Sequence, residues 1–284
     1  MIHDYIDLIR VRQWYKNLLV FLALFFAGAL FNWADVRITL LAFFSLSFIS
    51  SVGYILNDLV DLEKDKSHPE KKLRSLASGK VSKSVAGVLG IVLLLFGFGI
   101  SFLIGLSFVY VLASFFALSL LYTFVLKKII FADVIAISLF FVARAVAGAI
   151  AINVYISPWL ILCPFFLALF LAVGKRHSDL LLLKEKAGKT RDVLADYTLD
   201  LTNSLMIVST TLLLISYALY SFFSNHQNFI IALPFAVFVV FRYYYLIQSG
   251  SVIAREPEKL LKDKQMVIGI VLWGLVTFLL LYMV

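Results

Sequence analysis

The chain has 284 residues and a formal net charge of +8, and 62% of its residues are hydrophobic, with a mean hydropathy of +0.99. Soluble domains are nearer half apolar, so this composition excludes an ordinary soluble fold. The single cysteine, Cys163, excludes an internal disulfide and a cysteine-based metal cluster. The sequence is therefore that of a membrane protein.

Long apolar runs carry the secondary-structure signal. About 20 helical residues cross a ~30 Å hydrocarbon core. Only helices or closed barrels satisfy the backbone there, and the runs lack the alternation of strands. The sequence predicts an all-α integral membrane protein, a nine-helix transmembrane bundle forming one domain over 1–284. The predicted spans, in chain order, are 17–33, 36–57, 84–104, 106–126, 131–151, 158–174, 203–224, 228–247 and 265–284.

The basic residues predict the orientation. Three long polar loops separate the spans: 58–83, 175–202 and 248–264. Arg37 lies beside a loop on one side and Arg144 lies inside a span, whereas the other Lys and Arg residues face the opposite side. By the positive-inside rule, that side and the N-terminus are cytoplasmic. Because the charge is divided among loops and not gathered on one folded face, no nucleic-acid partner is expected.

The first polar loop opens with an acidic segment. Asn57, Asp61 and Asp65 are spaced i, i+4, i+8, so a helix continuing out of the membrane would align them on one face. Asp58 is rotated from them by about 100°. Oxygen ligands of this kind suit Mg²⁺, which takes a few carboxylates and leaves the rest to water and phosphates. The alternative is a solvated helix end, but acids at the membrane boundary are costly unless paired or functional.

A basic segment follows the acidic one. Lys71, Lys72 and Arg74 could bind phosphates, with Arg74 as the bidentate candidate. The alternative is an ordinary basic loop on the cytoplasmic side. Pro69 breaks the helix before this segment, and Gly79 permits a close turn after it.

Arg144 is the most informative residue inside a predicted span. A charge there is expensive, and we expect it to face the interior with a substrate phosphate or a carboxylate as partner. Asp133 is one candidate, although the two lie about 16 Å apart along a helix, which disfavours a direct pair. Asp133 also fits a helix N-terminus, and a purely structural Arg144 remains an alternative.

The acidic and basic segments together resemble the UbiA prenyltransferase superfamily. The matching motifs are Asn57-Asp58-xx-Asp61-xxx-Asp65, at the end of the second predicted span, and Arg74-xx-Ala77-Ser78-Gly79. The resemblance implies a helical bundle whose acidic cytoplasmic loops hold Mg²⁺ and a diphosphate. It also implies that a prenyl chain lies among the helices.

Further segments resemble a narrower branch, the decaprenyl-phosphate phosphoribosyltransferases. They are IRVRQWYKN at 9–17, GKRHSDL at 174–180, RDVLADYT at 191–198, and Glu256-Pro257-Glu258 with Asp263 and Lys264. This branch transfers 5-phosphoribose from phosphoribosyl pyrophosphate (PRPP) to a polyprenyl phosphate, releasing pyrophosphate, in cell-envelope synthesis. The chain departs from the branch pattern at Ser75, His177 and Asp179, where proline, tyrosine and glutamate are usual.

The resemblance implies a role for each matched residue. The implied catalytic residues are Asp61, Asp65, Arg74 and Asp179. The implied metal ligands are Asn57, Asp58, Asp61 and Asp65. The implied substrate-binding residues are Lys16, Asn17, Lys71, Lys72, Arg74, Tyr122, Lys128, Arg144, Lys175, Arg176, Arg191 and Tyr197. Two alternatives stay open: Lys16 and Asn17 as an interfacial anchor, and Lys175 with Asp179 as an i, i+4 ion pair.

Two other functions compete with this interpretation. A UbiA enzyme that joins a prenyl diphosphate to an aromatic acceptor is favoured by Asp192-xxx-Asp196, which imitates a second aspartate motif. A transporter would place polar residues at the bilayer midplane, whereas here they gather at the cytoplasmic ends of the spans. The leading expectation is a Mg²⁺-dependent enzyme of the inner cell membrane whose partners are PRPP, a polyprenyl phosphate and membrane lipids.

Overall fold

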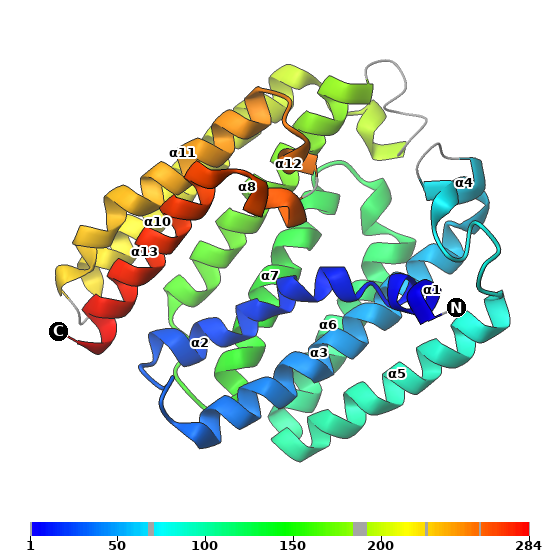
Figure 1. Ribbon diagram of the computed structural model, residues 1–284, viewed down its shortest axis with the longest axis horizontal. Coiled ribbons are helices and arrows are strands. Elements are labelled where there is room, and N and C mark those ends of the chain that lie inside the picture. Colours follow the sequence, from blue (N-terminus) through cyan, green and yellow to red (C-terminus); the bar gives the residue numbers. More distant parts are fainter. Residues whose placement is uncertain (1, 68–70, 184–191, 225–226, 256, 284) are drawn as a thin grey trace. The chain divides into compact units, whose positions relative to one another are not determined.

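The computed structural model describes residues 2–67, 71–183, 192–224, 227–255 and 257–283, and within these ranges it is helical, with no strand. Within the described ranges, eight helices are long and apolar enough to cross a membrane. Figure 1 shows how the helices are arranged. The eight are Trp33–Val60, Lys83–Ile104, Leu106–Lys128, Ala132–Ala151, Pro158–Leu182, Leu199–Phe223, Asn228–Gln248 and Lys264–Tyr282. These eight match the second to ninth predicted spans, which confirms the multi-pass helical fold.

The helices divide into two compact units. The first unit comprises Met1–Lys127 and Ala143–Ile156, and the second comprises Lys128–Val142 and Ser157–Val284. Helix α7 (Ala132–Ala151) contributes its first part to the second unit and its last part to the first. The expectation of a single domain over 1–284 stays a prediction.

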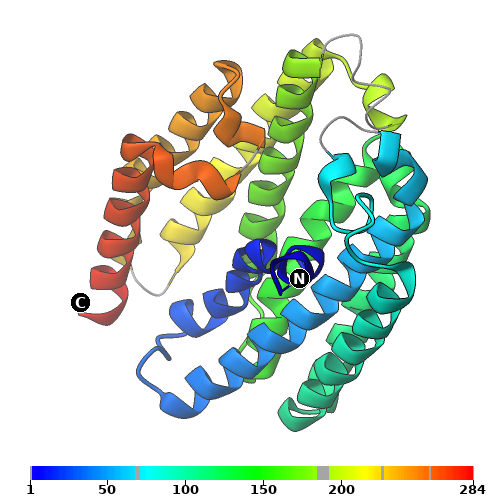
Figure 2. The ribbon, with the colours of Figure 1, turned by 45° about the vertical axis from the view of Figure 1, so that its right-hand side comes forward.

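Helix α3 is the centre of the first unit. The unit contains α1 (Ile2–Leu8), η1 (Val11–Val20), α2 (Phe21–Phe26), α3 (Trp33–Val60), α4 (Leu62–Ser67), η2 (Lys71–Leu73), α5 (Lys83–Ile104) and α6 (Leu106–Phe124). Figures 1 and 2 show α5 running alongside α3, which also contacts α6 and η1. At Gly97 a Cβ atom would lie 2.8 Å from Ile49, and Ser45 donates a hydrogen bond to the Gly97 carbonyl at 2.8 Å. This small residue permits the close approach of α3 and α5.

The first predicted span, 17–33, is wrong in its position and its form. The helical segment begins earlier, as the 3₁₀ helix η1, continues as α2, and ends before Gly28, whose φ is +71°. A 3₁₀ helix rises about 2.0 Å per residue, so η1 and α2 together extend about 29 Å, close to the thickness of a hydrocarbon core. The sequence suggested a start at residue 17 because polar residues precede the apolar run. In the structure these polar residues belong to η1 and not to a loop before it.

The acidic segment crosses a helix boundary. The sequence predicts one continuous helix over 57–65, whereas α3 ends at Val60 and α4 begins at Leu62. The backbone hydrogen bonds from Asp61 N to Asn57 O and from Asp65 N to Asp61 O continue the helical pattern across the junction. The predicted i, i+4, i+8 spacing is therefore retained, but the junction lets the side chains turn to different partners.

The second unit is built on two pairs of packed helices, α8 with α10 and α11 with α13. Its elements after α7 are α8 (Pro158–Leu183), η5 (Asp192–Ala195), α10 (Leu199–Phe223), η6 (Gln227–Ala232), α11 (Leu233–Gln248), α12 (Val252–Arg255), η7 (Pro257–Lys262) and α13 (Lys264–Tyr282). Figure 1 shows α10, α11 and α13 side by side. Buried Phe170, Met206 and Ile247 belong to the core. A Cβ at Gly174 would lie 2.4 Å from Ile247, so this glycine brings α8 against α11.

Helix α8 is longer than predicted. The sequence ends this span at 174, whereas α8 continues to Leu183 and carries Lys175, Arg176 and Asp179 on regular helix. The prediction stopped there because the charges begin at Lys175. Since Arg176 and Asp179 are buried, the polar turns of α8 are packed within the second unit and do not form a loop.

Candidate functional site

The Lys127 ammonium group binds side-chain oxygens of the acidic segment. Lys127, in the short helix η3 (Leu126–Lys128) after α6, donates from Nζ to both carboxylate oxygens of Asp61 at 2.7 Å and to Asn57 Oδ1 at 3.0 Å. The side chains of Lys127 and Asp61 are 11% and 24% exposed. Three oxygens thus converge on one cation at a position that solvent still reaches.

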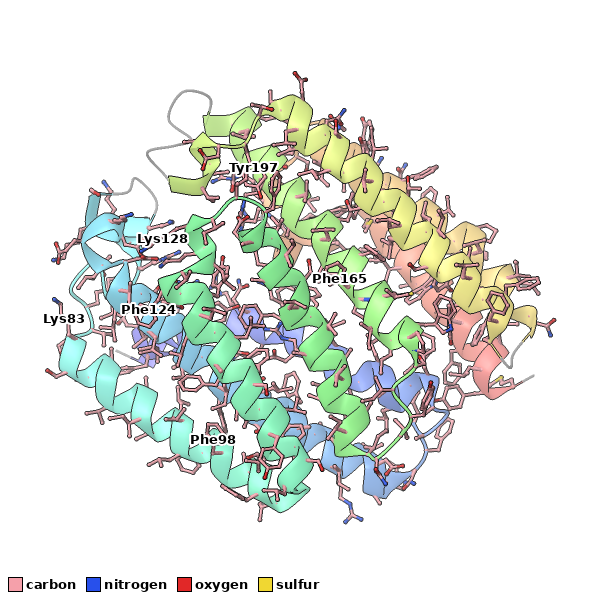
Figure 3. The ribbon with its side chains drawn as sticks, turned by 180° about the vertical axis from the view of Figure 1, so that it is seen from behind. Lys83, Phe98, Phe124, Lys128, Phe165 and Tyr197 are labelled. Carbon is pink, nitrogen blue, oxygen red and sulfur yellow. The ribbon has the colours of Figure 1, made fainter. Side chains whose placement is uncertain are left out.

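The sequence argument selected Lys128 instead of its neighbour. Lys128 is exposed (Figure 3). Successive residues of a 3₁₀ helix point about 120° apart, so only one of two adjacent lysines can face the acids. Sequence offers no signal that distinguishes Lys127 from Lys128, because both follow the same apolar run.

Asp58 belongs to a different group of charges. Its Oδ1 accepts hydrogen bonds from Arg10 Nη2 and from Arg74 Nη1, the latter at 3.0 Å. Arg74 Nη1 also donates to Asp65 Oδ2, and Lys71 Nζ lies 3.9 Å from Asp65 Oδ1. The predicted set of four metal ligands is therefore divided: Asn57 and Asp61 face Lys127, whereas Asp58 and Asp65 face arginines.

Arg10 is the residue of this group that received no role from the sequence. Its guanidinium lies over the Tyr54 ring, 4.9 Å from the centroid, and its backbone is left-handed, with φ 53° and ψ 49°. Burial lowers the pKa of Arg10, but the Asp58 carboxylate, with Tyr54 and Asp65, offsets this, so the pKa lies above its usual value. The one feature of the sequence that could have identified Arg10 as a site residue is its place in the segment IRVRQWYKN at 9–17.

The basic loop is tied to the N-terminal helix. Buried Ser75 donates from its hydroxyl to Asp7 Oδ2 at 3.1 Å, and Lys80 Nζ lies 3.6 Å from Asp4 Oδ1. The resemblance leads us to expect proline at position 75, and the Ser75 hydroxyl makes a contact that proline could not make. Lys72 is exposed and has no partner recorded among the described residues.

Arg144 lies in the interior of the first unit, as predicted, and an amide is among its partners. Its Nε donates to Asn17 Oδ1 at 2.6 Å, and its guanidinium lies over Phe115 at 5.0 Å. Asn17 in turn donates to Ser47 Oγ at 2.9 Å. Asp133, the carboxylate partner that helix length already disfavoured, pairs with Arg176.

Two other predicted binding residues lie in the first unit. Lys16 is half-buried, with its ammonium 5.9 Å from the Tyr15 ring centroid. Tyr122 is half-buried on α6. Asn17 is 1% exposed, so it is a core residue and not the interfacial anchor that was the alternative.

A second polar group is sealed inside the second unit. Arg176 Nε donates to Asp133 Oδ2 at 2.8 Å, and the Tyr197 hydroxyl donates to Asp133 Oδ1 at 2.8 Å. The Phe131 N–H donates to the Tyr197 oxygen at 3.1 Å (Figure 3). Arg176, Asp133 and Tyr197 are 1%, 0% and 3% exposed. Burial, and next the Asp133 charge, raise the pKa of Tyr197 above its usual value.

Asp179 has a partner that the i, i+4 rule did not predict. Its Oδ1 accepts a hydrogen bond from Arg255 Nε of α12 at 2.9 Å, while Lys175 is exposed. Arg191 lies outside the described residues. Of the possible second aspartate motif, Asp196 is exposed, and the side chain of Asp192 is likewise not described.

The side-chain oxygens of Asn57 and Asp61 suit a divalent cation only if substrate phosphates and water supply the remaining ligands. Among the residues that the structure describes, no three His, Cys, Asp or Glu side chains are grouped to hold a metal. Mg²⁺ commonly uses one or two carboxylates and completes its shell with water and phosphate oxygens. The oxygens of Asn57 and Asp61, which already surround a cation, fit that pattern.

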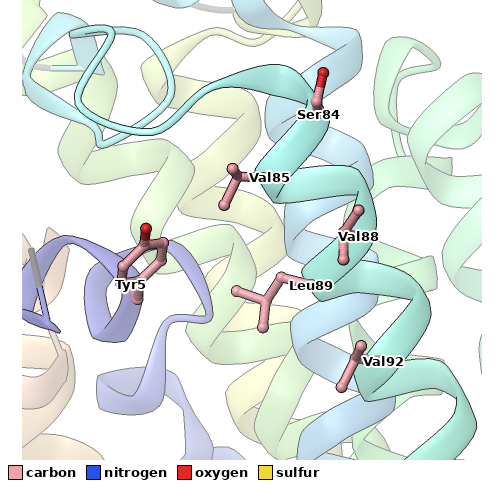
Figure 4. Close-up of a pocket in the computed structure, with 6 residues that line it drawn as sticks. All are labelled: Tyr5, Ser84, Val85, Val88, Leu89 and Val92. Atoms are coloured by element: carbon pink, nitrogen blue, oxygen red, sulfur yellow. The ribbon is translucent and has the colours of Figure 1, made fainter.

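An apolar groove of about 370 Å³ lies between α1 and α5 of the first unit (Figure 4). Its lining residues are Tyr5, Ser84, Val85, Val88, Leu89 and Val92. It contains no acid or base, so it has none of the groups that phosphate chemistry requires. Such a surface on a membrane-spanning helix suits contact with lipid chains.

Comparison with known proteins agrees with this architecture. Solved structures with the same fold include a UbiA homologue from Archaeoglobus fulgidus bound to GPP and Mg²⁺, at TM-score 0.75 and 20% identity over 98% of this chain and 99% of that one. A structure of digeranylgeranylglyceryl phosphate synthase gives TM-score 0.67 and 17% identity over 100% and 99% of the two chains. The fold and its eight apolar helices define a multi-pass membrane protein.

Sequence comparison gives the family. The UbiA prenyltransferase family model matches residues 18–189, and the chain belongs to that family. It is 32% identical to decaprenyl-phosphate phosphoribosyltransferase of Mycolicibacterium smegmatis over 96% of this chain and 91% of that protein. The enzymes of the same name from Corynebacterium glutamicum and Mycobacterium tuberculosis are 34% and 29% identical, covering 78% and 93% of this chain and 69% and 90% of theirs.

Proposed function

We propose that this protein transfers 5-phosphoribose from PRPP to a polyprenyl phosphate and releases pyrophosphate. The observation that carries the proposal is the set of charges around the acidic segment of the first unit. The similarity to three decaprenyl-phosphate phosphoribosyltransferases supports it. Two anionic substrates must approach each other in this reaction. Arg10, Arg74, Lys71 and Lys127 gather the positive charge that this approach requires.

The reaction separates charge at the anomeric carbon. The bond to pyrophosphate breaks, the ribose ring becomes positive, and a phosphate oxygen of the lipid forms the new bond. The leaving group gains negative charge, which cationic side chains held in place stabilise. Because the lipid phosphate is already ionised at neutral pH, it needs no strong general base.

Each residue of the acidic segment has a distinct task in this proposal. Asn57 and Asp61 would hold Mg²⁺, which supplies Lewis-acid stabilisation of the pyrophosphate when it is bound. Asp65 and Asp58 keep the Arg74 guanidinium in place, since both accept hydrogen bonds from it. Arg74, with Lys71 and the predicted Lys72, binds substrate phosphate.

The proposed location follows from the charges. We place the N-terminus and the acidic segment on the cytoplasmic side of the inner cell membrane, where soluble PRPP is available and where basic residues are retained. Lys175, Arg191 and Asp179 stay predicted contributors to the substrate site.

A direct assay tests the proposal. Purified protein receives Mg²⁺, labelled PRPP and decaprenyl phosphate, and we expect label in the lipid fraction. Asp61→Asn should lower the yield of lipid product about 10²–10³-fold. Asp35→Asn makes the same chemical change in the first turn of the same helix α3 and should retain the product. Unchanged product with Asp61→Asn would contradict the role of this segment.

The main alternative is prenyl transfer from a prenyl diphosphate to an aromatic acceptor. It is favoured by the fold shared with the homologue from Archaeoglobus fulgidus, whose structures hold GPP or DMAPP with Mg²⁺. The same assay distinguishes the two. Turnover of a prenyl diphosphate with an aromatic acceptor, and none of PRPP, would replace our proposal with this one.

A further inference from the structure

The Lys127 ammonium occupies the place that a metal ion would take. Both Asp61 oxygens and Asn57 Oδ1 lie within hydrogen-bonding distance of its Nζ, at 2.7, 2.7 and 3.0 Å. Mg²⁺ binds its oxygens at about 2.0–2.1 Å, so an ion that uses these same three oxygens must lie where the ammonium now is. The two cations therefore exclude each other.

The arrangement allows Lys127 to leave without disturbing the fold. Its charge is carried on a flexible four-carbon stem, and its backbone belongs to the three-residue helix η3. Its side chain is 11% exposed and that of Asp61 is 24% exposed, so solvent and ligands reach the pair. By contrast, Arg74 is held by two carboxylates at once.

We propose that Lys127 is a built-in competitor of the divalent cation. The metal then binds the Asn57 and Asp61 oxygens tightly only when a phosphate-bearing ligand attracts the ammonium away from them. Metal and phosphate consequently bind cooperatively, and the site avoids holding a metal when no substrate is present. This inference rests on the proposed function, in which Asn57 and Asp61 hold the metal.

Metal binding in the absence of turnover tests the inference. Free Mn²⁺ is followed by electron paramagnetic resonance as it is titrated into the purified full-length protein. Lys127→Gln should bind Mn²⁺ about tenfold more tightly than the wild type, because the competing charge is gone. Lys127→Arg keeps a cation and should bind weakly, as the wild type does. Lys128→Gln removes the same charge from the next residue and serves as the matched control.

A second arm tests the coupling. Inorganic phosphate should tighten Mn²⁺ binding to the wild type, after correction for the complex that phosphate forms with Mn²⁺ in protein-free buffer. The gain should be smaller in Lys127→Gln, where no ammonium has to be displaced. Thermal unfolding of each variant establishes that the compared proteins are folded, and Lys127→Met replaces Lys127→Gln if the latter is not.

The outcomes separate the inference from the proposed function. Equal Mn²⁺ affinity in Lys127→Gln and the wild type, with loss of binding in Asp61→Asn, would overturn the competitor role and leave the metal site standing. Equal tightening by Lys127→Gln and Lys128→Gln would overturn it too, since it would reveal a general charge effect. Unchanged binding in Asp61→Asn would contradict the metal assignment itself.

Discussion

The two units each contain a group of charges built from the same residue types, yet the two groups differ in access to solvent. In the first unit the paired side chains of Asp61 and Lys127 are 24% and 11% exposed. In the second unit Asp133 and Arg176 are 0% and 1% exposed. Partly exposed ion pairs can exchange partners at lower cost, whereas a fully buried pair cannot be opened without leaving a charge unpaired. The comparison indicates a working site in the first unit and a structural support in the second.

The largest effect should come from opening the buried pair. Arg176→Met leaves the Asp133 carboxylate buried without its cation, and we expect a loss of about 3–5 kcal/mol in the free energy of unfolding. Thermal unfolding in detergent measures it, and Asp133→Asn in the same chain should recover part of the loss. If Arg176→Met unfolds like the wild type but does not bind PRPP, the predicted substrate-binding role of Arg176 is right and the comparison fails.

The opposite result is expected at the partly exposed pair of Asp61 and Lys127. Asp61→Asn removes the carboxylate from the proposed metal site and should lower turnover by about 10²–10³-fold. Its unfolding temperature should stay within a few degrees of the wild type, because the amide oxygen still accepts from Lys127. A large loss of stability in this variant would make the first group structural as well.

A smaller effect should separate Asp58 from the metal ligands. Asp58→Asn weakens the hydrogen bonds from Arg10 and Arg74, and we expect the KM for PRPP to rise about tenfold. The affinity for Mn²⁺ should be unchanged. If Mn²⁺ binding is lost instead, the four-ligand set predicted from the sequence is right.

The smallest effect concerns the Tyr197 hydroxyl. Tyr197→Phe removes one buried hydrogen bond to Asp133 and should cost about 1 kcal/mol at neutral pH. Since the folded pKa of Tyr197 is raised, its stabilising contribution is present below the ordinary tyrosine pKa of about 10 and is lost as the pH rises above it. The difference between wild type and variant, followed by denaturation at several pH values, should therefore shrink above about pH 10. A difference that grows with pH would contradict the assignment.

Much of the fold could be predicted because apolar runs mark membrane helices directly. The exceptions have polar residues inside a helix. Asn17 lies inside η1, and Arg176 and Asp179 lie on α8 beyond its predicted end. In both places the polar side chains are buried against partners distant in the sequence, so no local pattern reveals them.

The acidic segment was found from its spacing, but its internal division was not. Helical periodicity placed Asn57 and Asp61 together and put Asp58 apart, and the structure agrees with that separation. It could not reveal that Asp65 faces Arg74, that Lys127 instead of Lys128 faces Asp61, or that Arg10 joins the group. Those choices depend on the junction of α3 and α4 and on the short helix η3.

One measurement tests the central claim most directly: transfer of label from PRPP to decaprenyl phosphate per mole of folded protein, for Asp61→Asn and Arg176→Met side by side. We predict that Asp61→Asn is folded and inactive, whereas the folded fraction of Arg176→Met has the specific activity of the wild type. An active Asp61→Asn together with a folded but inactive Arg176→Met would contradict the account and place the working site in the second unit.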